Sequence, residues 1–364
     1  MASPTTVINA SDDELNTTDF GELIYESAPT WTFVLVVIMA ILSLVGVIRN
    51  AAVVSVILWH PSMRNTPNAL VACLAIGDLM FLFTSAPFKI YHTLMANWPF
   101  GEVVCKLSNG VIIISLSVSV FSLTALSYDR FKAIVTPMNY TKCNSTKIIY
   151  GIIVAIWILS IVLSLPTIVW SEHVDWGGGY YGCIFLDQHS LNAKIYESVR
   201  CLVLFVLPLM IISVFYTLVS RKLFRSTKAM PGEVHDKRAQ ISSRKRLAVM
   251  VLAIIILFAV CWFPSTIISL LFQIKPSVVM TMRMAFFRIA ANLLAYANSS
   301  LNPILLIIVS SNYRKHIGNC LCPFKPRKGK KYRKVGRSAT FSSKVSTGMG
   351  PLVSVRTKVT EFPA

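Results

Sequence analysis

Two groups of residues place reactive chemistry at unusual positions in a very apolar chain. Asp129 and Arg130 stand side by side where a long uncharged run ends, and Asp78 is the only acid in the middle of any apolar stretch. Three further polar residues lie at comparable depths: Ser119, Asn298 and Asn302. Because ionisable groups inside a membrane helix cost on the order of several kcal/mol, such residues are expected to face the interior of a helix bundle.

The polar residues around Asp78 suggest two kinds of site. Carboxylate, amide and hydroxyl oxygens are ligands for a small hard cation, or they hold a network of water molecules. A hydrogen-bonded structural cluster without an ion is the equal alternative. A small hard cation at Asp78 is therefore the only metal that these residues suggest.

The composition indicates a membrane protein. Of 364 residues, 54% are hydrophobic and 14% are charged, while the formal charge is +19, a combination that ordinary soluble domains lack. A transmembrane helix needs about 20 mostly apolar residues. Seven stretches meet this requirement: 32–58, 68–95, 105–135, 147–170, 198–220, 247–273 and 284–309. The expected fold is an all-α bundle of seven transmembrane helices.

Basic residues indicate the orientation of this bundle, because short basic loops resist translocation. The loop between the fifth and sixth spans is rich in Lys and Arg, whereas residues 1–31 hold no basic residue and six acids. We therefore expect a multi-pass plasma-membrane protein with an extracellular N-terminus and a cytoplasmic C-terminus. The basic residues flank the spans, so anionic lipid of the bilayer is their expected partner and nucleic acid is not.

Three segments follow from this topology. Residues 1–31 are expected to form an extracellular tail, and residues 322–364 a cytoplasmic tail. Residues 32–321 hold the seven-helix bundle and a short amphipathic helix that lies at the membrane surface after the seventh span.

Several residues are candidates for covalent modification. Sequons at Asn9 and Asn16 suit glycosylation of the extracellular tail. At the end of the amphipathic segment, Cys320 and Cys322 are candidates for palmitoylation, with free cytosolic thiols as the alternative.

A disulfide is expected between Cys105 and Cys183, the two cysteines at the oxidising outer face. The loop that contains Cys183 also holds Gly177 to Gly179, a pattern typical of a β-hairpin over the mouth of the bundle.

Other function classes lack their characteristic residues. The chain has no GxSxG, no HExxH and no paired acids in the spans, so it is not expected to be an enzyme. A retinal-binding protein needs a lysine in the last span, and residues 285–309 contain none. A transporter or channel would need polar residues along several spans, whereas the polar residues gather around Asp78.

A set of motifs at matching intervals then points to a family. The set includes IRN with Asn50, LAIGD with Asp78, Cys105, DRF from Asp129 to Phe131, Trp157, Pro208 with Tyr216, CWFP and NSSLNP. Residues 32–321 resemble the rhodopsin-like (class A) G-protein-coupled receptors. The stretches VSVFSLTALSYDRFKAIVTPM, SRKRLA and NLLAYANSSLNP are similar to the bombesin, CCHamide and endothelin branch, whose ligands are peptides.

The resemblance implies partners on both sides of the membrane. An extracellular peptide is the expected ligand, and a heterotrimeric G protein, with the Gq type favoured, is the expected inner partner. Receptor kinases and arrestin are expected at the tail. Residues implied in G-protein coupling are Asp129, Arg130, Phe131, Pro137, Met138, Tyr216, Arg244 and Lys245. Residues implied in a sodium or switch cluster are Asn50, Asp78, Ser119, Trp262, Asn298 and Asn302.

The expected ligand pocket lies at the outer mouth, with Lys89, Ile112, Arg200, Trp262, Arg288 and Asn292 as its candidate residues. Amine receptors of the family carry an aspartate near Ile112, so a cationic amine has no counter-ion here. A polar peptide suits this lining, although the basic residues could instead snorkel to the interface or pair, as Glu197 with Arg200. A non-peptide ligand is the alternative.

Departures from the branch narrow these expectations. The bombesin receptors have a glutamine where Ile112 stands and an arginine where Asn292 stands, so the bombesin peptides themselves are not the expected ligands. Leu306 replaces the usual tyrosine after the NP of span seven. Arg244 stands where many relatives have an acid that holds the arginine of span three, which leaves Asp129 as the evident restraint on Arg130.

Overall fold

The computed structural model describes residues 30–136, 146–185, 190–228, 235–274, 282–309 and 313. Within these ranges, seven helical segments are long and apolar enough to cross a membrane, as the sequence predicts. In chain order they consist of α2 (Thr30–Trp59), α3 with α4 (Thr66–Met80, Ala86–Met95), α5 (Gly101–Val135), α7 (Thr146–Trp170), α8 with α9 (Leu191–Cys201, Leu207–Lys228), α10 (His235–Ile274) and α12 (Met282–Val309).

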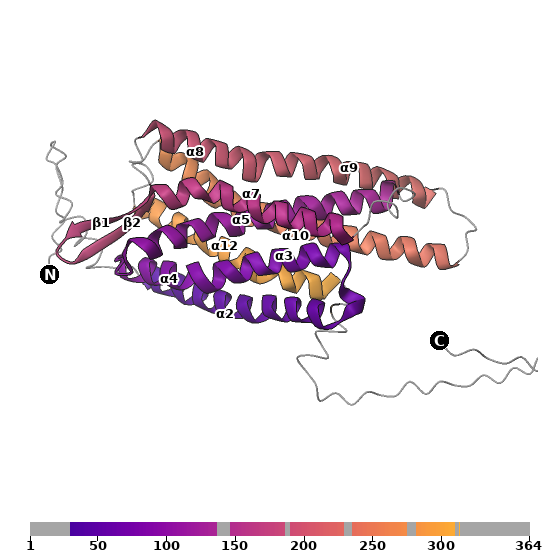
Figure 1. Cartoon of the computed structure of the whole chain (residues 1–364), viewed down its shortest axis with the longest axis horizontal. Coiled ribbons are helices and arrows are strands. Elements are labelled where there is room, and N and C mark those ends of the chain that lie inside the picture. Colours follow the sequence, from indigo (N-terminus) through magenta and orange to yellow (C-terminus); the bar gives the residue numbers. More distant parts are fainter. Residues whose placement is uncertain are drawn as a thin grey trace, which may run out of the picture. The chain divides into compact units, whose positions relative to one another are not determined.

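The seven segments run side by side, and α5 lies among the others (Figure 1). It contacts α3, α7, α9 and α10. Because α5 is surrounded, its small polar residues are buried: Ser115, Ser117, Ser119, Ser122 and Ser127. Small residues let helices approach closely, which is the usual device for packing helices in a membrane.

A glycine of α5 lies directly against α7. A Cβ atom built on Gly110 would lie 2.4 Å from Cγ1 of Ile168 on α7, so no larger residue fits there without movement. Gly151 on α7 has open space instead, with no atom within 4 Å of such a Cβ. The absence of a side chain at residue 110 is therefore part of the α5–α7 interface.

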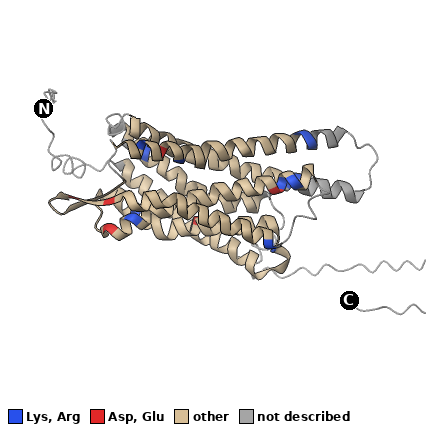
Figure 2. Cartoon of the chain, turned by 45° about the horizontal axis from the view of Figure 1, so that its top comes forward, with Lys and Arg blue, Asp and Glu red and all other residues tan. Residues whose placement is uncertain are grey.

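Charged residues collect toward the two ends of the bundle, and its middle is almost free of them (Figure 2). Apolar side chains cover the outside of that middle, for example Leu44 on α2 and Val162 on α7, which are 65% and 53% exposed. In a membrane these side chains face lipid. We call the two ends the hairpin end and the Arg130 end, after features described next.

Two spans are interrupted by wide π-helical turns just before a proline. Phe81–Ser85 (η2) precedes Pro87, and Leu202–Val206 (η3) precedes Pro208. Proline removes one backbone donor and its ring clashes with the carbonyl four residues earlier, and a wider turn relieves that clash. The first turn places Ser85 against α5, where its Oγ donates to the carbonyl oxygen of Ser108 at 3.0 Å.

A β-hairpin covers one end of the bundle, as the glycine pattern predicts. Strand β1 (Ser171–Gly177) pairs antiparallel with β2 (Tyr180–Phe185), and Gly177, Gly178 and Gly179 all have positive φ angles at the turn. The hairpin is fixed to the loop before α5, because the backbone N–H of Trp98 donates to the carbonyl of Tyr181 at 2.9 Å.

Candidate functional site

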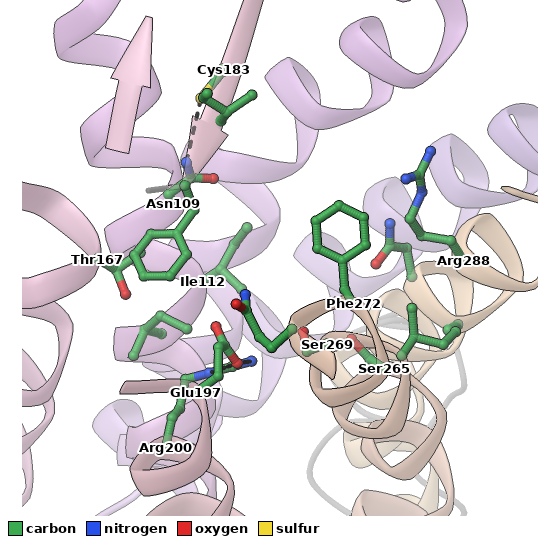
Figure 3. A pocket seen from close by; sticks show the side chains of 17 residues that line it. Asn109, Ile112, Thr167, Cys183, Glu197, Arg200, Ser265, Ser269, Phe272 and Arg288 are labelled. Carbon is green, nitrogen blue, oxygen red and sulfur yellow. Dashed lines mark hydrogen bonds and ion pairs between the residues drawn. The ribbon is translucent and has the colours of Figure 1, made fainter. Parts of the chain in front are cut away.

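A cavity of about 380 Å³ lies at the hairpin end of the bundle. Helices α5, α7, α8, α10 and α12 and strand β2 all contribute to its lining (Figure 3). Apolar side chains such as Ile112 and Phe272 are combined with three ionised ones: Glu197, Arg200 and Arg288. A cavity of this size with a few polar groups among apolar ones is typical of a ligand-binding site.

The cavity brings together four of the six residues that the sequence suggests for ligand binding: Ile112, Arg200, Arg288 and Asn292. The other two lie elsewhere. The ammonium of Lys89 lies 5.2 Å from the centre of the Trp98 ring, where the ring face attracts a cation. Trp262 is 7% exposed and packs in the core against Phe258, with ring centroids 6.4 Å apart.

Glu197 and Arg200 form an ion pair within the wall of the cavity. The Nε of Arg200 donates to Oε2 of Glu197 at 2.9 Å, and a terminal guanidinium nitrogen donates to the same oxygen. Both residues lie on α8 three positions apart, so they are neighbours on one face of the helix. The pairing that the sequence raised as an alternative therefore occurs, and the two charges compensate each other.

The disulfide between Cys105 and Cys183 is present, as the sequence predicts, and joins α5 to β2. Asn109 supports it one turn further along α5, because its Nδ2 donates to Oγ of Ser171 at 3.0 Å and to Sγ of Cys183 at 3.4 Å. This asparagine lines the cavity, and the sequence did not single it out. Its hydrogen bonds depend on which residues of the hairpin face α5, and the sequence alone does not determine this.

Asp78 forms the centre of a buried polar cluster in the middle of the bundle. Its Oδ2 accepts a hydrogen bond from Nδ2 of Asn302 at 3.0 Å, and Asp78 has no exposed surface. Asn50 lies nearby in the same set of helices and donates to the carbonyl oxygens of Gly46 and Ser299, both at 2.9 Å. Ser119 is also buried.

Three of the polar residues that the sequence assigns to this cluster each have a side-chain oxygen without a hydrogen-bond partner in the described part of the chain. Oδ1 of Asp78, Oδ1 of Asn298 and Oδ1 of Asn302 are buried and have no hydrogen-bond partner among the described residues. Buried polar atoms normally have partners, so such unpaired oxygens call for an ion or a water. Carboxylate and amide oxygens are hard donors, which suit a small hard cation.

At the Arg130 end, Asp129 and Arg130 form a buried ion pair, with side chains 7% and 5% exposed respectively. The next residue, Phe131, stacks on Phe215 of α9 with ring centroids 5.3 Å apart. Tyr216 donates its hydroxyl to the carbonyl oxygen of Ala248 at 3.1 Å and so links α9 to α10. The Asp129–Phe131 motif of α5 and the Tyr216 motif of α9 therefore lie at the same end of the bundle.

A second, small cavity of about 80 Å³ lies beside Arg130. Tyr313 lines it as well, and its hydroxyl donates to Oδ1 of Asn68 at 3.0 Å. The side-chain amide of Asn68 in turn donates to the carbonyl oxygen of Met63 at 2.8 Å. Burial raises the pKa of Tyr313, so its hydroxyl keeps the proton that it donates. The amphipathic pattern after the seventh span does not predict this hydrogen bond.

Several candidate residues lie outside the described part of the chain: Asn9, Asn16, Pro137, Met138, Cys320 and Cys322. The amphipathic helix after the seventh span also falls there, apart from Tyr313. Arg244 and Lys245 lie on α10, and Lys245 is exposed.

The geometry defines a seven-helix membrane protein with a ligand-sized cavity at one end and a buried acid–arginine pair at the other. The sequence model of the "7 transmembrane receptor (rhodopsin family)" matches residues 49–306. Because this match covers most of the chain, the protein belongs to the rhodopsin family of seven-transmembrane receptors.

Individual receptors are similar over most of the chain. Bombesin receptor subtype-3 of Ovis aries is 34% identical over 286 residues, which cover 76% of this chain and 72% of the relative. A bombesin receptor of Bombina orientalis is also 34% identical over 286 residues, 76% of this chain and 73% of the relative. The neuropeptide CCHamide-1 receptor of Drosophila melanogaster is 32% identical over 356 residues, 94% of this chain and 70% of the relative.

Proposed function

We propose that this protein is a plasma-membrane receptor for an extracellular neuropeptide or peptide hormone and that it activates a heterotrimeric G protein. The cavity at the hairpin end carries the proposal, because it combines an apolar lining with ionised and amide side chains. The names of three relatives, two bombesin receptors and one CCHamide-1 receptor, favour a peptide of that class.

The cavity accommodates only a short part of such a peptide. Its volume of about 380 Å³ is near the lower end of the range for drug-sized ligands. We therefore expect one terminus of the peptide in the cavity and the remainder across the β1–β2 hairpin. The same volume favours a small non-peptide molecule as the second candidate ligand.

The mechanism follows from the separation of the two sites along α5. A peptide shifts the balance between two bundle arrangements only by the difference in its affinity for them. The prolines of α9, α10 and α12 are the places where half a helix can change direction, and the release of Arg130 from Asp129 frees the G-protein site. Coupling between the two ends is then reciprocal. Phe131, Tyr216, Arg244, Lys245 and the loop residues Pro137 and Met138 would contact the G protein.

The proposal also includes modification of the two tails and the partners of the cytoplasmic tail. Residues 322–364 form the cytoplasmic tail, where receptor kinases add phosphate and arrestin binds the added charge. Glycosylation at Asn9 and Asn16 and palmitoylation at Cys320 and Cys322 belong to the same proposal, as does an allosteric sodium ion at Asp78.

A peptide screen tests the proposed function directly. Cells that express the full chain are exposed to a panel of neuropeptides that includes CCHamide and bombesin peptides, and both calcium release and cyclic AMP are measured. A Gq-type partner predicts calcium release, and Arg130→Ala should abolish it at equal surface expression. Ion currents that persist without any G protein would contradict the proposal.

A further inference from the structure

Arg288 is the uncompensated charge of the cavity. Three ionised side chains line it, and Glu197 is already engaged by Arg200 through two hydrogen bonds. Among the described residues, Arg288 forms no ion pair and no hydrogen bond. Figure 3 shows the Glu197–Arg200 pair on one side of the cavity and Arg288 on the other.

The surroundings of Arg288 add positive charge. Lys89 and Arg288 both interact electrostatically with His92 on α4, so two cationic residues lie near each other at this end of the bundle. The described acids at this end are engaged or face solvent: Glu102 pairs with Lys106, Asp175 accepts from the backbone N–H of Gly177, and Glu172 is exposed. The side of the cavity next to α12 is therefore positive.

A second unpaired group in the lining points to a ligand. Gln273 on α10 lines the cavity and is 7% exposed, and its Oε1 is buried without a hydrogen-bond partner among the described residues. A buried carbonyl oxygen without a partner destabilises the protein unless something donates a hydrogen bond to it. A backbone N–H of a bound peptide supplies such a donor.

We infer that the peptide bound in this cavity presents a carboxylate to Arg288. The inference rests on the proposed function and adds the chemical class of the group that is recognised. When a peptide fills the cavity, the guanidinium of Arg288 loses water, and a desolvated charge needs an opposite charge to replace it. A guanidinium binds a carboxylate through two parallel hydrogen bonds, which fixes the orientation of the peptide as well as its charge.

The carboxylate has two sources, the side chain of Asp or Glu or a free C-terminus. Both provide the same contact with Arg288, and both leave an N–H of the peptide available to Oε1 of Gln273. A peptide library made in a free-acid form and in an amide form separates the two sources.

The test uses selection from a defined library. A split-pool mixture of synthetic nonapeptides is made in two forms, one with a free C-terminal carboxylate and one with a C-terminal amide. Each form is incubated with purified full-length receptor, and the retained peptides are sequenced by mass spectrometry. The same selection is made with Arg288→Gln, with Arg288→Glu, and with Lys194→Gln as the matched control. Lys194 is an exposed cation on α8 outside the cavity lining.

The enrichment of carboxylate-bearing peptides should be about tenfold or more higher with the wild-type protein and with Lys194→Gln than with Arg288→Gln. This factor corresponds to the loss of one charge-assisted hydrogen-bonded pair. Arg288→Glu should reverse the preference toward peptides with Lys or Arg. Enrichment in the free-acid form alone assigns the carboxylate to the C-terminus, and enrichment of Asp or Glu in both forms assigns it to a side chain.

Two results would overturn the inference, and they are distinguishable. In the first, the wild-type protein and Arg288→Gln retain peptides with the same carboxylate content. This result refutes the role of Arg288 and leaves the peptide-receptor proposal intact. Retention of no peptide by any variant with a normal melting temperature refutes both.

Discussion

Asp78 is fully buried, and it illustrates how one acid can be held inside a membrane protein. Asn302 donates to one carboxylate oxygen at 3.0 Å, while the other oxygen has no partner among the described residues. Oδ1 of Asn298 and Oδ1 of Asn302 are also buried without a partner among the described residues. A bound sodium ion would compensate the charge of the Asp78 carboxylate.

The replacement Asp78→Asn should remove the response of the protein to sodium. At a sodium concentration ten times the dissociation constant, binding stabilises the folded protein by about 1.4 kcal/mol, or about 3 °C in melting temperature. The measurement compares melting temperatures in sodium chloride and in N-methylglucamine chloride at equal ionic strength. Asp175→Asn, in the hairpin, is the control and should keep the full shift. A sodium-dependent shift that survives Asp78→Asn would rule out this site.

Residue types and positions predicted part of the candidate site. The motif residues Asp78 and Asn302, and likewise Asp129 and Arg130, contact each other as their positions suggest. Lys89 is basic and near the outer end of its span, which predicts a place in the pocket, yet it lies over Trp98. That contact depends on how the loop before α5 folds back, which charge and depth along a helix do not determine.

At the scale of the elements, Tyr313 joins the chain beyond α12 to the first turn of α3. The hydroxyl of Tyr313 and the amide of Asn68 form a short chain of hydrogen bonds that ends at Met63. Leu306 is buried in the core and has no hydroxyl. Leu306, which stands where the family usually has a tyrosine, therefore provides no hydroxyl. Among the described residues after the NP motif, Tyr313 provides a tyrosine hydroxyl at the cavity beside Arg130.

Tyr313→Phe should loosen this connection. The loss of one buried hydrogen bond costs about 1 kcal/mol, so the melting temperature should fall by about 2–4 °C. Basal nucleotide exchange by a purified G protein should rise, because Arg130 shares its cavity with the freed segment. Tyr150→Phe is the control, since Tyr150 is 64% exposed on α7. Equal melting temperature and equal basal exchange in Tyr313→Phe would show that the hydrogen bond holds nothing in place.

The interface between α5 and α7 provides a second test at this scale. Gly110→Ala places a Cβ atom against Ile168, and overpacking of this kind costs about 1–3 kcal/mol. The variant should lose thermal stability, whereas Gly151→Ala on α7 should not, because its Cβ meets open space. Adding Ile168→Ala to Gly110→Ala should restore part of the loss, and failure to do so would place the strain elsewhere.

The bounds of the elements show what the sequence could determine. The seven apolar stretches predicted the seven spans, and three successive glycines predicted the hairpin turn at Gly177–Gly179. The π-helical turns Phe81–Ser85 and Leu202–Val206 were not predicted. A proline signals that a helix is disturbed, but whether it kinks or widens depends on the packing of neighbouring helices, such as Ser85 against Ser108.

At the scale of the whole molecule, the distribution of basic residues predicts an extracellular N-terminus. An epitope tag at residue 1 should bind antibody on intact cells, and a tag at residue 364 only after permeabilisation. Treatment with N-glycosidase should increase electrophoretic mobility, and the double replacement Asn9→Gln with Asn16→Gln should abolish that change. Labelling of the C-terminal tag on intact cells would reverse the proposed topology.

Helix α5 connects the two ends of the molecule without interruption. It has 35 residues and contains no proline, which corresponds to a rod about 50 Å long. Its first turns carry Cys105, bonded to the hairpin, and its last turns carry Arg130. A helix with continuous backbone hydrogen bonds moves as one body. Reduction of the Cys105–Cys183 disulfide should therefore leave both ends folded while it removes the covalent link between the hairpin and the helix that carries Arg130.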